Sequence, residues 1–572
     1  MSNEHENRIE AALSRFRPVA PYLAIVGSVL LLISGLLSWS YDERVLGDIS
    51  VRFAPLYIQV YAMVMGAVGL WLGVLAWFGA RRSTTGRRWV DTTAGLHALG
   101  WWSTAFALAS LLAIAVTTGG LINANEGVWI ALVGALLVLA GGYAMAPVKT
   151  KDLMGLRLPD AVEILIVAAM LGIGLFVAAY ALELTDVAVL LIFVVAAIGV
   201  SLSLARAGIF SWFGGIGARH RRVLTLGAFV VAVLFPFTQG GSATNMNIAG
   251  NVLIFAATAL GLNIVVGLAG LLDLGYIAFL GAGAYVGATM SYSAFATISW
   301  KPPFLVVMLI GALVSAILGL IIGSPTLRVS GDYLAIVTLA FGEIFRLAMF
   351  NLDGQTGPNI TRGSNGINAI PDLEFFGFNF GEAHTIFGVV IPRAGNYYFL
   401  LLILMAFIIL VFVNLNNSRI GRGWVAIRED ERAAEAMGVN TFGLKLLAFA
   451  GGASLAGMAG TVKAHQDIAV SPDSYIFLES AFLLAAVVLG GMGTVGGVLL
   501  GAALLKFIPE KLREAQDYRL LFFGLILVLM MRFRPEGLVA SRRRALEFHE
   551  DDEELADDVQ QDIEIIQQGV AR

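Results

Sequence analysis

Apolar runs of membrane-spanning length recur along most of this chain and limit what it can fold into. Hydrophobic residues make up 58% of the 572 residues and charged residues only 14%, whereas soluble domains contain about 25% charged residues. The runs are continuous and do not alternate with a period of two, which indicates helices. The sequence therefore predicts an all-α, polytopic transmembrane helix bundle.

We expect about sixteen hydrophobic segments, some of which are short enough to be re-entrant. The shortest pair, 476–490 and 496–508, is joined by a glycine-rich turn. We interpret the first segment as a retained span, with a cleaved signal peptide as the alternative. The expected segments are 22–39, 57–79, 95–117, 127–146, 162–182, 186–205, 223–238, 251–269, 274–292, 304–323, 332–350, 397–413, 444–463, 476–490, 496–508 and 519–533.

Charged residues alternate from one loop to the next and predict the orientation of these segments, because basic loops stay in the cytoplasm. Carrying the alternation along the chain places both termini in the cytoplasm, residues 351–396 outside and residues 419–443 inside. The basic residues that support this orientation are Arg81, Arg82, Arg87, Arg88, Lys149, Lys151, Arg157, Arg206, Arg219, Arg221, Arg222, Arg328, Arg532, Arg534 and Arg542 to Arg544.

Residues 419–443 form the longest charged insertion between apolar runs in the second half of the chain. Residues 424–437 contain no Gly or Pro and are rich in Ala, Glu and Arg, which predicts one short helix. Gly421 and Gly423 precede that helix, and Gly438 with Asn440 is typical of a C-terminal cap. The segment is either a solvated loop helix or a docking helix for a soluble partner.

Glycine is dense in two stretches, residues 261–287 and 488–504. One interpretation is close helix packing, since Gly281, Gly283 and Gly287 have small-residue spacing. The other is broken helices, because irregular backbone at membrane depth survives only where it is buried in protein or lines a cavity. Broken helices would place Gly267, Gly270, Asp273, Gly275, Gly490, Gly491 and Gly493 along a substrate pathway.

Few charged residues fall inside the apolar runs. Glu343 and Arg346 are three residues apart on one expected helix, so we predict an intramembrane ion pair. Glu479 begins the run before the second glycine stretch, and Lys463 ends the previous one. A proton relay would need several unpaired deep carboxylates, so we favour structural pairing.

No motif indicates an enzyme, a metal site or a cofactor. The chain has no Cys, and its six His residues do not have metal-ligand spacing. A G-x-x-x-x-G-K-[ST] sequence is absent, so ATP hydrolysis would require a separate chain. We expect no nucleic-acid partner.

Six segments, in order over about residues 247–540, resemble the membrane subunits of bacterial branched-chain amino acid ABC importers of the LivM-like type. The segments are GLNIVVGLAGLLDLGYIAFLGAGAYVG, GDYLAIVTLAFGEIFRL, TGPNITRGSNGI, SRIGRGWVAIREDERAAEAMGVNTFGLKLLAFAGGASLAGMAG, VLGGMGTVGGVLLGA and LLFFGLILVLMMRFRPEGL. The resemblance implies that residues 419–443 form the cytoplasmic coupling helix, which docks on the ATPase subunit.

The resemblance also indicates which residues couple to the ATPase. Importer permeases carry an E-A-A-x-x-x-G pattern in this helix, and Arg432-Ala433-Ala434 and Gly438 fill its register here. The Glu is displaced to Glu431 or Glu435. The expected coupling residues are Arg428, Glu431, Arg432, Ala433, Ala434, Glu435 and Gly438.

The resemblance implies a permease subunit in a bacterial inner membrane, working with ATPase subunits, a homologous second permease and an external substrate-binding protein. We expect three parts. Residues 1–240 form an N-terminal extension of about seven transmembrane helices, 241–541 the permease domain with coupling loop 415–443, and 542–572 an acidic cytoplasmic tail.

Three alternatives stay open at this point. A permease for urea or short amides would look the same, because selection in such systems lies mostly with the binding protein. The broken-helix interpretation also fits an ion-coupled secondary transporter. A scaffold or sensor would use the N-terminal helices and the acidic tail to bind another protein.

Overall fold

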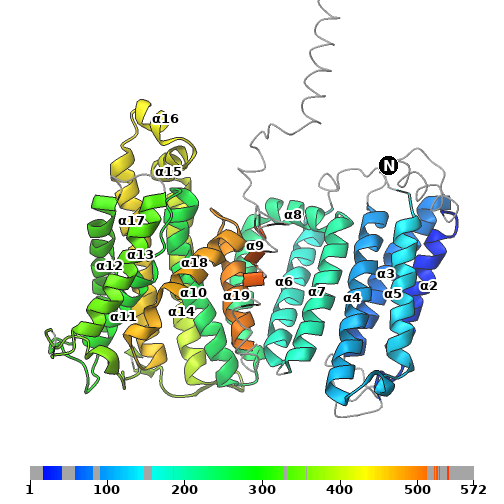
Figure 1. Ribbon diagram of the computed structural model, residues 1–572, viewed down its shortest axis with the longest axis horizontal. Coiled ribbons are helices and arrows are strands. Elements are labelled where there is room, and N and C mark those ends of the chain that lie inside the picture. Colours follow the sequence, from blue (N-terminus) through cyan, green and yellow to red (C-terminus); the bar gives the residue numbers. More distant parts are fainter. Residues whose placement is uncertain are drawn as a thin grey trace, which may run out of the picture. The chain divides into compact units, whose positions relative to one another are not determined.

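The computed structural model describes residues 17–40, 58–81, 90–146, 158–184, 186–326, 332–355, 357–375 and 377–511, with 521, 524, 525, 527, 528, 532 and 537–539. The fold is mostly helical and separates into two compact units, Met1–Thr238 and Gln239–Arg572 (Figure 1). The expected acidic tail and most of segment 519–533 lie outside the described residues. So do several basic loop residues, namely Arg82, Arg87, Arg88, Lys149, Lys151, Arg157, Arg328, Arg534 and Arg542 to Arg544.

The first unit is built from eight helices within the described residues. They are α2 (Ala20–Ser34), α3 (Ile58–Arg81), α4 (Thr92–Thr118), α5 (Glu126–Ala144), α6 (Asp160–Glu183), α7 (Val187–Arg206), α8 (Ile209–Arg219) and α9 (Arg221–Leu234), with 3-10 turns η1 (Leu121–Asn123) and η3 (Phe235–Thr238). Figure 1 shows α8 lying across the ends of α6 and α7. The apolar-run analysis missed α8, because eleven residues are too few for a span.

A buried carboxylate fastens the end of α8 to the start of α6. Glu163 is 2% exposed, and its two oxygens accept hydrogen bonds from Arg219 at 2.7 and 3.0 Å. His220 Nε2 lies 3.0 Å from the same carboxylate, and the backbone N–H of Leu158 donates to it at 3.2 Å. The buried charge is therefore paired from several sides, as a charge at such a site must be.

The second unit holds the glycine-rich stretches and the charged insertion. Its helices are α10 (Ala243–Asn263), continued by the π-helical η4 (Ile264–Leu268), then α11 (Ile277–Thr289), α12 (Phe304–Thr326), α13 (Asp332–Asn351), α14 (Arg393–Asn417), α15 (Arg419–Glu429), α16 (Glu431–Ala436), α17 (Thr441–Asp467), α18 (Phe477–Gly490) and α19 (Val495–Lys511). Short 3-10 turns are η5 (Gly363–Asn365) and η6 (Pro472–Tyr475).

Glycines let the central helices of this unit approach one another. A Cβ on Gly283 of α11 would lie 2.0 Å from the carbonyl oxygen of Gly457 in α17. A Cβ on Gly457 would in turn lie 2.6 Å from the carbonyl oxygen of Gly311 in α12. The packing interpretation therefore holds for these glycines, and α17 sits between α11 and α12 at backbone contact.

Twelve helices in the described part of the chain are long and apolar enough to cross a membrane, and α2 and α11 are shorter apolar helices. The fold is thus that of a multi-pass membrane protein. The total of about sixteen segments and the location of the termini stay predictions. α11 contains 13 residues, which is about 20 Å of helix against a hydrocarbon core of about 30 Å. α18 reaches spanning length together with η6, over Pro472–Gly490.

The long connection between α13 and α14 carries two short hairpins that the sequence did not indicate. β1 (Glu374–Phe375) pairs with β2 (Phe378–Asn379), and β3 (His384–Ile386) pairs with β4 (Val389–Ile391), both antiparallel. An isolated bridge joins Ile367 to Val470, just beyond the end of α17. The connection therefore lies at the end of the unit opposite to α15 and α16.

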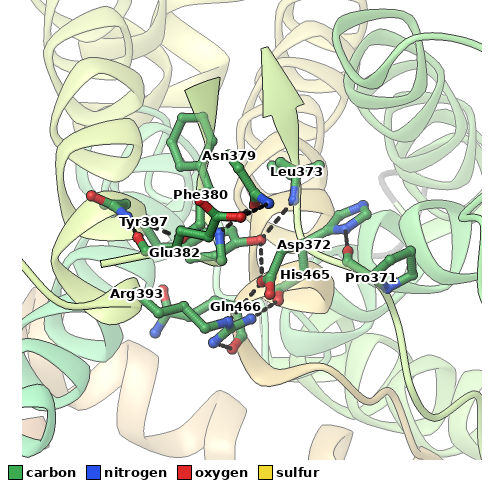
Figure 2. Close-up of polar contacts among 12 residues, drawn as sticks. Pro371, Asp372, Leu373, Asn379, Phe380, Glu382, Arg393, Tyr397, His465 and Gln466 are labelled. Carbon is green, nitrogen blue, oxygen red and sulfur yellow. Dashed lines mark hydrogen bonds and ion pairs between the residues drawn. The ribbon is translucent and has the colours of Figure 1, made fainter. Parts of the chain in front are cut away.

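Arg393, the first residue of α14, fastens this connection to α17 (Figure 2). Its Nε donates to Asp372 Oδ1 at 2.7 Å, and its two Nη groups donate to the carbonyl oxygens of His465 and Gln466 at 2.7 and 3.0 Å. The Tyr397 hydroxyl donates to the same Asp372 oxygen at 3.0 Å. One guanidinium thus joins three chain segments by charge-assisted hydrogen bonds.

Candidate functional site

The first glycine stretch is a helix break. α10 loosens into the π-helical turn η4, and the chain is then non-helical until α11 begins at Ile277. Gly270 has a φ of +71°, a conformation that L side chains rarely adopt. A Cβ on Gly275 would lie 1.9 Å from the carbonyl oxygen of Thr338. Glycine is therefore required here both for the turn and for close approach to α13.

The second glycine stretch forms the turn between α18 and α19. Gly491 and Gly493 have φ values of +115° and +78°. A Cβ on Gly490 would lie 2.2 Å from the carbonyl oxygen of Gly497, so the two helices touch at the turn. The structure thus shows a tight antiparallel pair of short helices at this stretch.

Asn263 joins the two breaks. Its side chain is fully buried near the end of α10, and its Oδ1 accepts a hydrogen bond from the backbone N–H of Gly493 at 2.8 Å. Its Nδ2 donates to the carbonyl oxygen of Thr494 at 3.3 Å. The sequence analysis did not single out Asn263. An amide within an apolar run was the signal that could have revealed it.

The charged insertion differs from the predicted single helix. It forms two helices, α15 and α16, that project beyond the ends of α12 and α13 (Figure 1). The break is at Asp430, whose backbone is extended and whose side chain caps α16 by accepting from the N–H of Ala433 at 3.0 Å. Gly421 and Gly423 lie inside α15 and not before it. Gly438 follows α16 with a φ of +84°, as a C-cap glycine does.

Arg428 connects α15 to the first break. One Nη1 hydrogen bond, 2.8 Å long, runs from Arg428 to the carbonyl oxygen of Gly267. The Arg428 stem also covers Gly270, where a Cβ would lie 2.5 Å from Arg428 Cγ. Gly267, Gly270 and Arg428 therefore form one contact, although the sequence analysis had assigned them to separate groups.

The two short helices are anchored to α17 on one side and exposed on the other. Trp424 is 1% exposed, and its Nε1 donates to the carbonyl oxygen of Leu444 at 2.7 Å. Glu431 pairs with Lys445. Ala434 is buried, whereas the remaining predicted coupling residues of this helix are exposed, namely Arg432, Ala433 and Glu435.

Met437, at the end of α16, is 84% exposed. It leaves an uncovered apolar side chain on the exposed side of α16, next to Arg432 and Glu435. The sequence analysis omitted Met437 from the coupling residues, because nothing in the sequence tells an exposed Met from a buried one.

Asp273 lies between α10 and α11, outside both helices, and is 1% exposed. Its Oδ1 accepts from the backbone N–H of Gly275 at 2.9 Å, and its Oδ2 has no hydrogen-bond partner among the described residues. The carboxyl group is thus buried at the break, with one oxygen bonded to the backbone of Gly275.

The structure brings Glu343 and Arg346 together on α13. Arg346 Nε donates to Glu343 Oε2 at 2.9 Å, and Arg346 Nη1 lies 3.7 Å from Asp473 Oδ1. The Arg346 and Glu343 side chains are 25% and 36% exposed. The two residues do pair, and the position of the pair within a membrane stays a prediction. The pair lies apart from the contact between Arg428 and Gly267, and no described contact joins the two.

The chain is similar in sequence to a known family of transport proteins. A family described as "Branched-chain amino acid transport system / permease component" matches residues 244–531. The chain is 39% identical over 338 residues to the high-affinity branched-chain amino acid transport system permease protein LivM of Salmonella typhimurium and 38% identical to that of Escherichia coli. Each match covers 57% of this chain and 76% of the relative.

A shorter match reaches a second kind of permease. The chain is 31% identical over 129 residues to the permease protein LivH of Escherichia coli, covering 22% of this chain and 41% of that protein. No solved structure gave a significant match. Because the family match spans half of the sequence and the LivM relatives are matched over three quarters of their length, this chain belongs to the branched-chain amino acid transport system permease family.

Proposed function

We propose that this chain is the permease subunit of an ATP-driven importer that moves branched-chain or related amino acids across a bacterial inner membrane. The observation that carries the proposal is the contact of Arg428 with Gly267 and Gly270. That contact links α15 and α16, which we call the docking element, to a helix break. The family of this chain is one of branched-chain amino acid transport.

The charge of the docking element supports its assignment to the cytoplasmic side. α15 and α16 carry Arg419, Arg422, Arg428 and Arg432, and basic segments stay in the cytoplasm. The hairpins β1 to β4 and the contacts of Arg393 are then on the outer face, where an external binding protein would deliver the substrate.

The partners follow from what the chain lacks and from its relatives. The sequence has no Walker motif, so ATPase subunits would hydrolyse ATP and bind the exposed side of α16 at Met437, Arg432 and Glu435. The likeness to LivH supports a homologous second permease as the other half of the pathway.

The hydrogen bonds of the site suggest how docking is transmitted. A displacement of α15 moves Arg428, which holds the carbonyl oxygen of Gly267 at the first break. Asn263, in the preceding helical turn, holds the α18–α19 turn through Gly493. Both glycine breaks would therefore respond to one movement of the ATPase, which is what alternating access requires.

Co-purification tests the proposal. The chain is expressed with the ATPase and permease subunits encoded beside it and is purified through a tag, as wild type and as Met437→Asp. We expect the wild type to retain both partners and Met437→Asp to lose the ATPase but keep the second permease. Phe387→Asp is the matched control, since Phe387 is 95% exposed at the opposite end of the unit.

A chain that purifies alone in its wild-type form would contradict the proposal. Loss of the ATPase from Phe387→Asp as well would show that the docking surface is not α16. Ala434 is unsuitable for such a test, because it is buried and a large side chain there disturbs the fold of α16 itself.

A further inference from the structure

Unit 2 contains a cavity of about 300 Å³ whose lining is charged on one part and apolar on another. Cavities of about 300–1,000 Å³ are typical of small-molecule sites. The charged part consists of Lys463, Asp467, Glu479, Lys506 and Glu510. None of these residues belongs to the coupling contacts of Arg428 and Asn263 described above.

The cavity reaches the middle of the membrane. Phe255 stands near the midpoint of the span Ala243–Leu268, and Lys506 Nζ lies 4.7 Å from the centre of its ring. The same Nζ is 2.7 Å from Glu479 Oε2. Charges at this depth are costly, and they mark substrate pathways where they face a cavity.

The ion pair joins two short helices, with Glu479 on α18 and Lys506 on α19. α18 contains 14 residues and starts at Phe477, so Glu479 lies in its first turn. The backbone N–H of Ile277, the first residue of α11, donates to Ser480 Oγ of α18 at 3.0 Å. Two short helices therefore begin next to each other at this depth, an arrangement that transporters use at substrate sites.

The ion pair remains accessible. Lys506 and Glu479 are each 30% exposed, and both line the cavity. Lys463 pairs with Asp467 at the end of α17, and Ser474 lines the cavity beside it. The cavity thus extends from mid-depth toward the end of the unit opposite to α16.

The charges favour one class of solute. Two lysines and three carboxylates line the cavity, so a free anion meets a net negative lining. A solute with a single charge can pair with only one of Lys506 and Glu479. A zwitterion offers its carboxylate to Lys506 and its ammonium to Glu479, so neither charge is stranded. Ile254, Phe255 and Leu280 supply an apolar wall for its side chain.

We propose that this cavity binds an amino acid in transit, with Lys506 holding the α-carboxylate, Glu479 the α-ammonium, and the apolar wall the branched side chain. The proposal rests on the transport function proposed above and names a substrate contact within the permease itself.

A charge swap distinguishes this role from simple stabilisation. The double variant Glu479→Lys with Lys506→Glu keeps an ion pair but exchanges its two ends. It is assembled with the partner subunits and the binding protein in vesicles, and labelled leucine uptake is measured. We expect uptake to fall about tenfold or more, the effect of losing a charge-assisted hydrogen bond.

Glu343→Gln, outside the cavity, is the control and should keep its uptake, because it leaves Arg346 beside its second partner Asp473. Recovery of wild-type uptake in the Glu479 and Lys506 double swap, after loss in each single variant, would overturn the proposal in favour of a structural pair.

Cysteine labelling provides a test that does not depend on transport. The chain has no Cys, so Ser474→Cys introduces the one thiol of this chain, in the lining of the cavity. In the purified complex we expect leucine to slow its labelling by a thiosulfonate several-fold. The amine 3-methylbutylamine and the acid 4-methylpentanoate, which each carry half of the zwitterion, should not slow it.

Phe387→Cys, 95% exposed at the turn between β3 and β4 and not part of the cavity lining, should label at the same rate with and without leucine. Absence of protection of Ser474→Cys, or equal protection by the amine or the acid, would overturn the proposal. If the wild-type complex shows no ATP-dependent uptake while the protection is present, the transport function fails and the binding site stands.

Discussion

At the scale of single residues, the contacts of Arg428 and Asn263 explain how one surface element can act on two helix breaks. Each contact ends on a backbone atom of a glycine stretch, the carbonyl oxygen of Gly267 or the N–H of Gly493. Glycine exposes backbone where another residue would cover it. The glycines are therefore not only breaks but also the attachment points of the polar residues.

Removal of the Arg428 contact should uncouple ATP hydrolysis from uptake. Arg428→Ala loses a charge-assisted hydrogen bond of ~1.5–3 kcal/mol, so we expect leucine taken up per ATP hydrolysed to fall about tenfold while the complex still assembles. Arg419→Ala, an exposed arginine on the same helix, is the control. An unchanged ratio in Arg428→Ala would show that the contact does not transmit movement.

Single residues were the hardest part to predict from sequence. Gly270, Gly491 and Gly438 were identified because positive φ leaves a composition signal in the chain. Met437 and Asn263 were not, because exposure and burial at these positions depend on elements distant in the sequence. The ion pair of Lys506 and Glu479 was missed for the same reason, since 27 residues separate its members.

At the scale of elements, Asp430 explains why the charged insertion is two helices. Asp favours an N-cap over a helix interior, since its side chain bonds nearby backbone N–H groups. It therefore starts α16 and ends α15. Residues 424–437 contain no Gly or Pro, and their composition therefore predicted a single helix. An N-cap residue such as Asp430 interrupts a helix as well.

The end of α16 should tolerate Asn but not Pro at residue 438. Gly438 has a φ of +84°, and its N–H donates to the carbonyl oxygen of Glu435 at 2.9 Å. Pro fixes φ at about −65° and has no N–H, whereas Asn visits the left-handed region. We expect Gly438→Pro to abolish substrate-stimulated ATP hydrolysis with the spans still inserted.

Gly438→Asn is the matched control and should retain stimulated hydrolysis, because nothing lies within 4 Å of a Cβ at this position. Normal stimulation of ATP hydrolysis in Gly438→Pro would mean that α16 does not transmit the signal.

Long apolar elements were predictable, and short ones were not. The expected runs 95–117 and 304–323 correspond to α4 and α12 within a few residues, since twenty apolar residues have few other uses. α8 and the two hairpins were missed because their lengths give no such signal. The glycine stretches left packing and breaks open as alternative interpretations, and the structure contains both.

At the scale of the whole molecule, the family match and the two compact units divide the chain in a similar way. The match covers residues 244–531, and the second unit starts at Gln239. Docking element, breaks and cavity all lie in that unit. The N-terminal unit, Met1–Thr238, lies outside the family match and is compact by itself.

The central claim, that this chain is driven by a separate ATPase, is tested most directly by leucine uptake into vesicles that contain the full complex and its binding protein. The account predicts uptake that needs ATP on the α16 side and survives a protonophore. Uptake by the chain without any ATPase, or its collapse on adding a protonophore while ATP is held constant, would contradict the account and indicate an ion-coupled transporter.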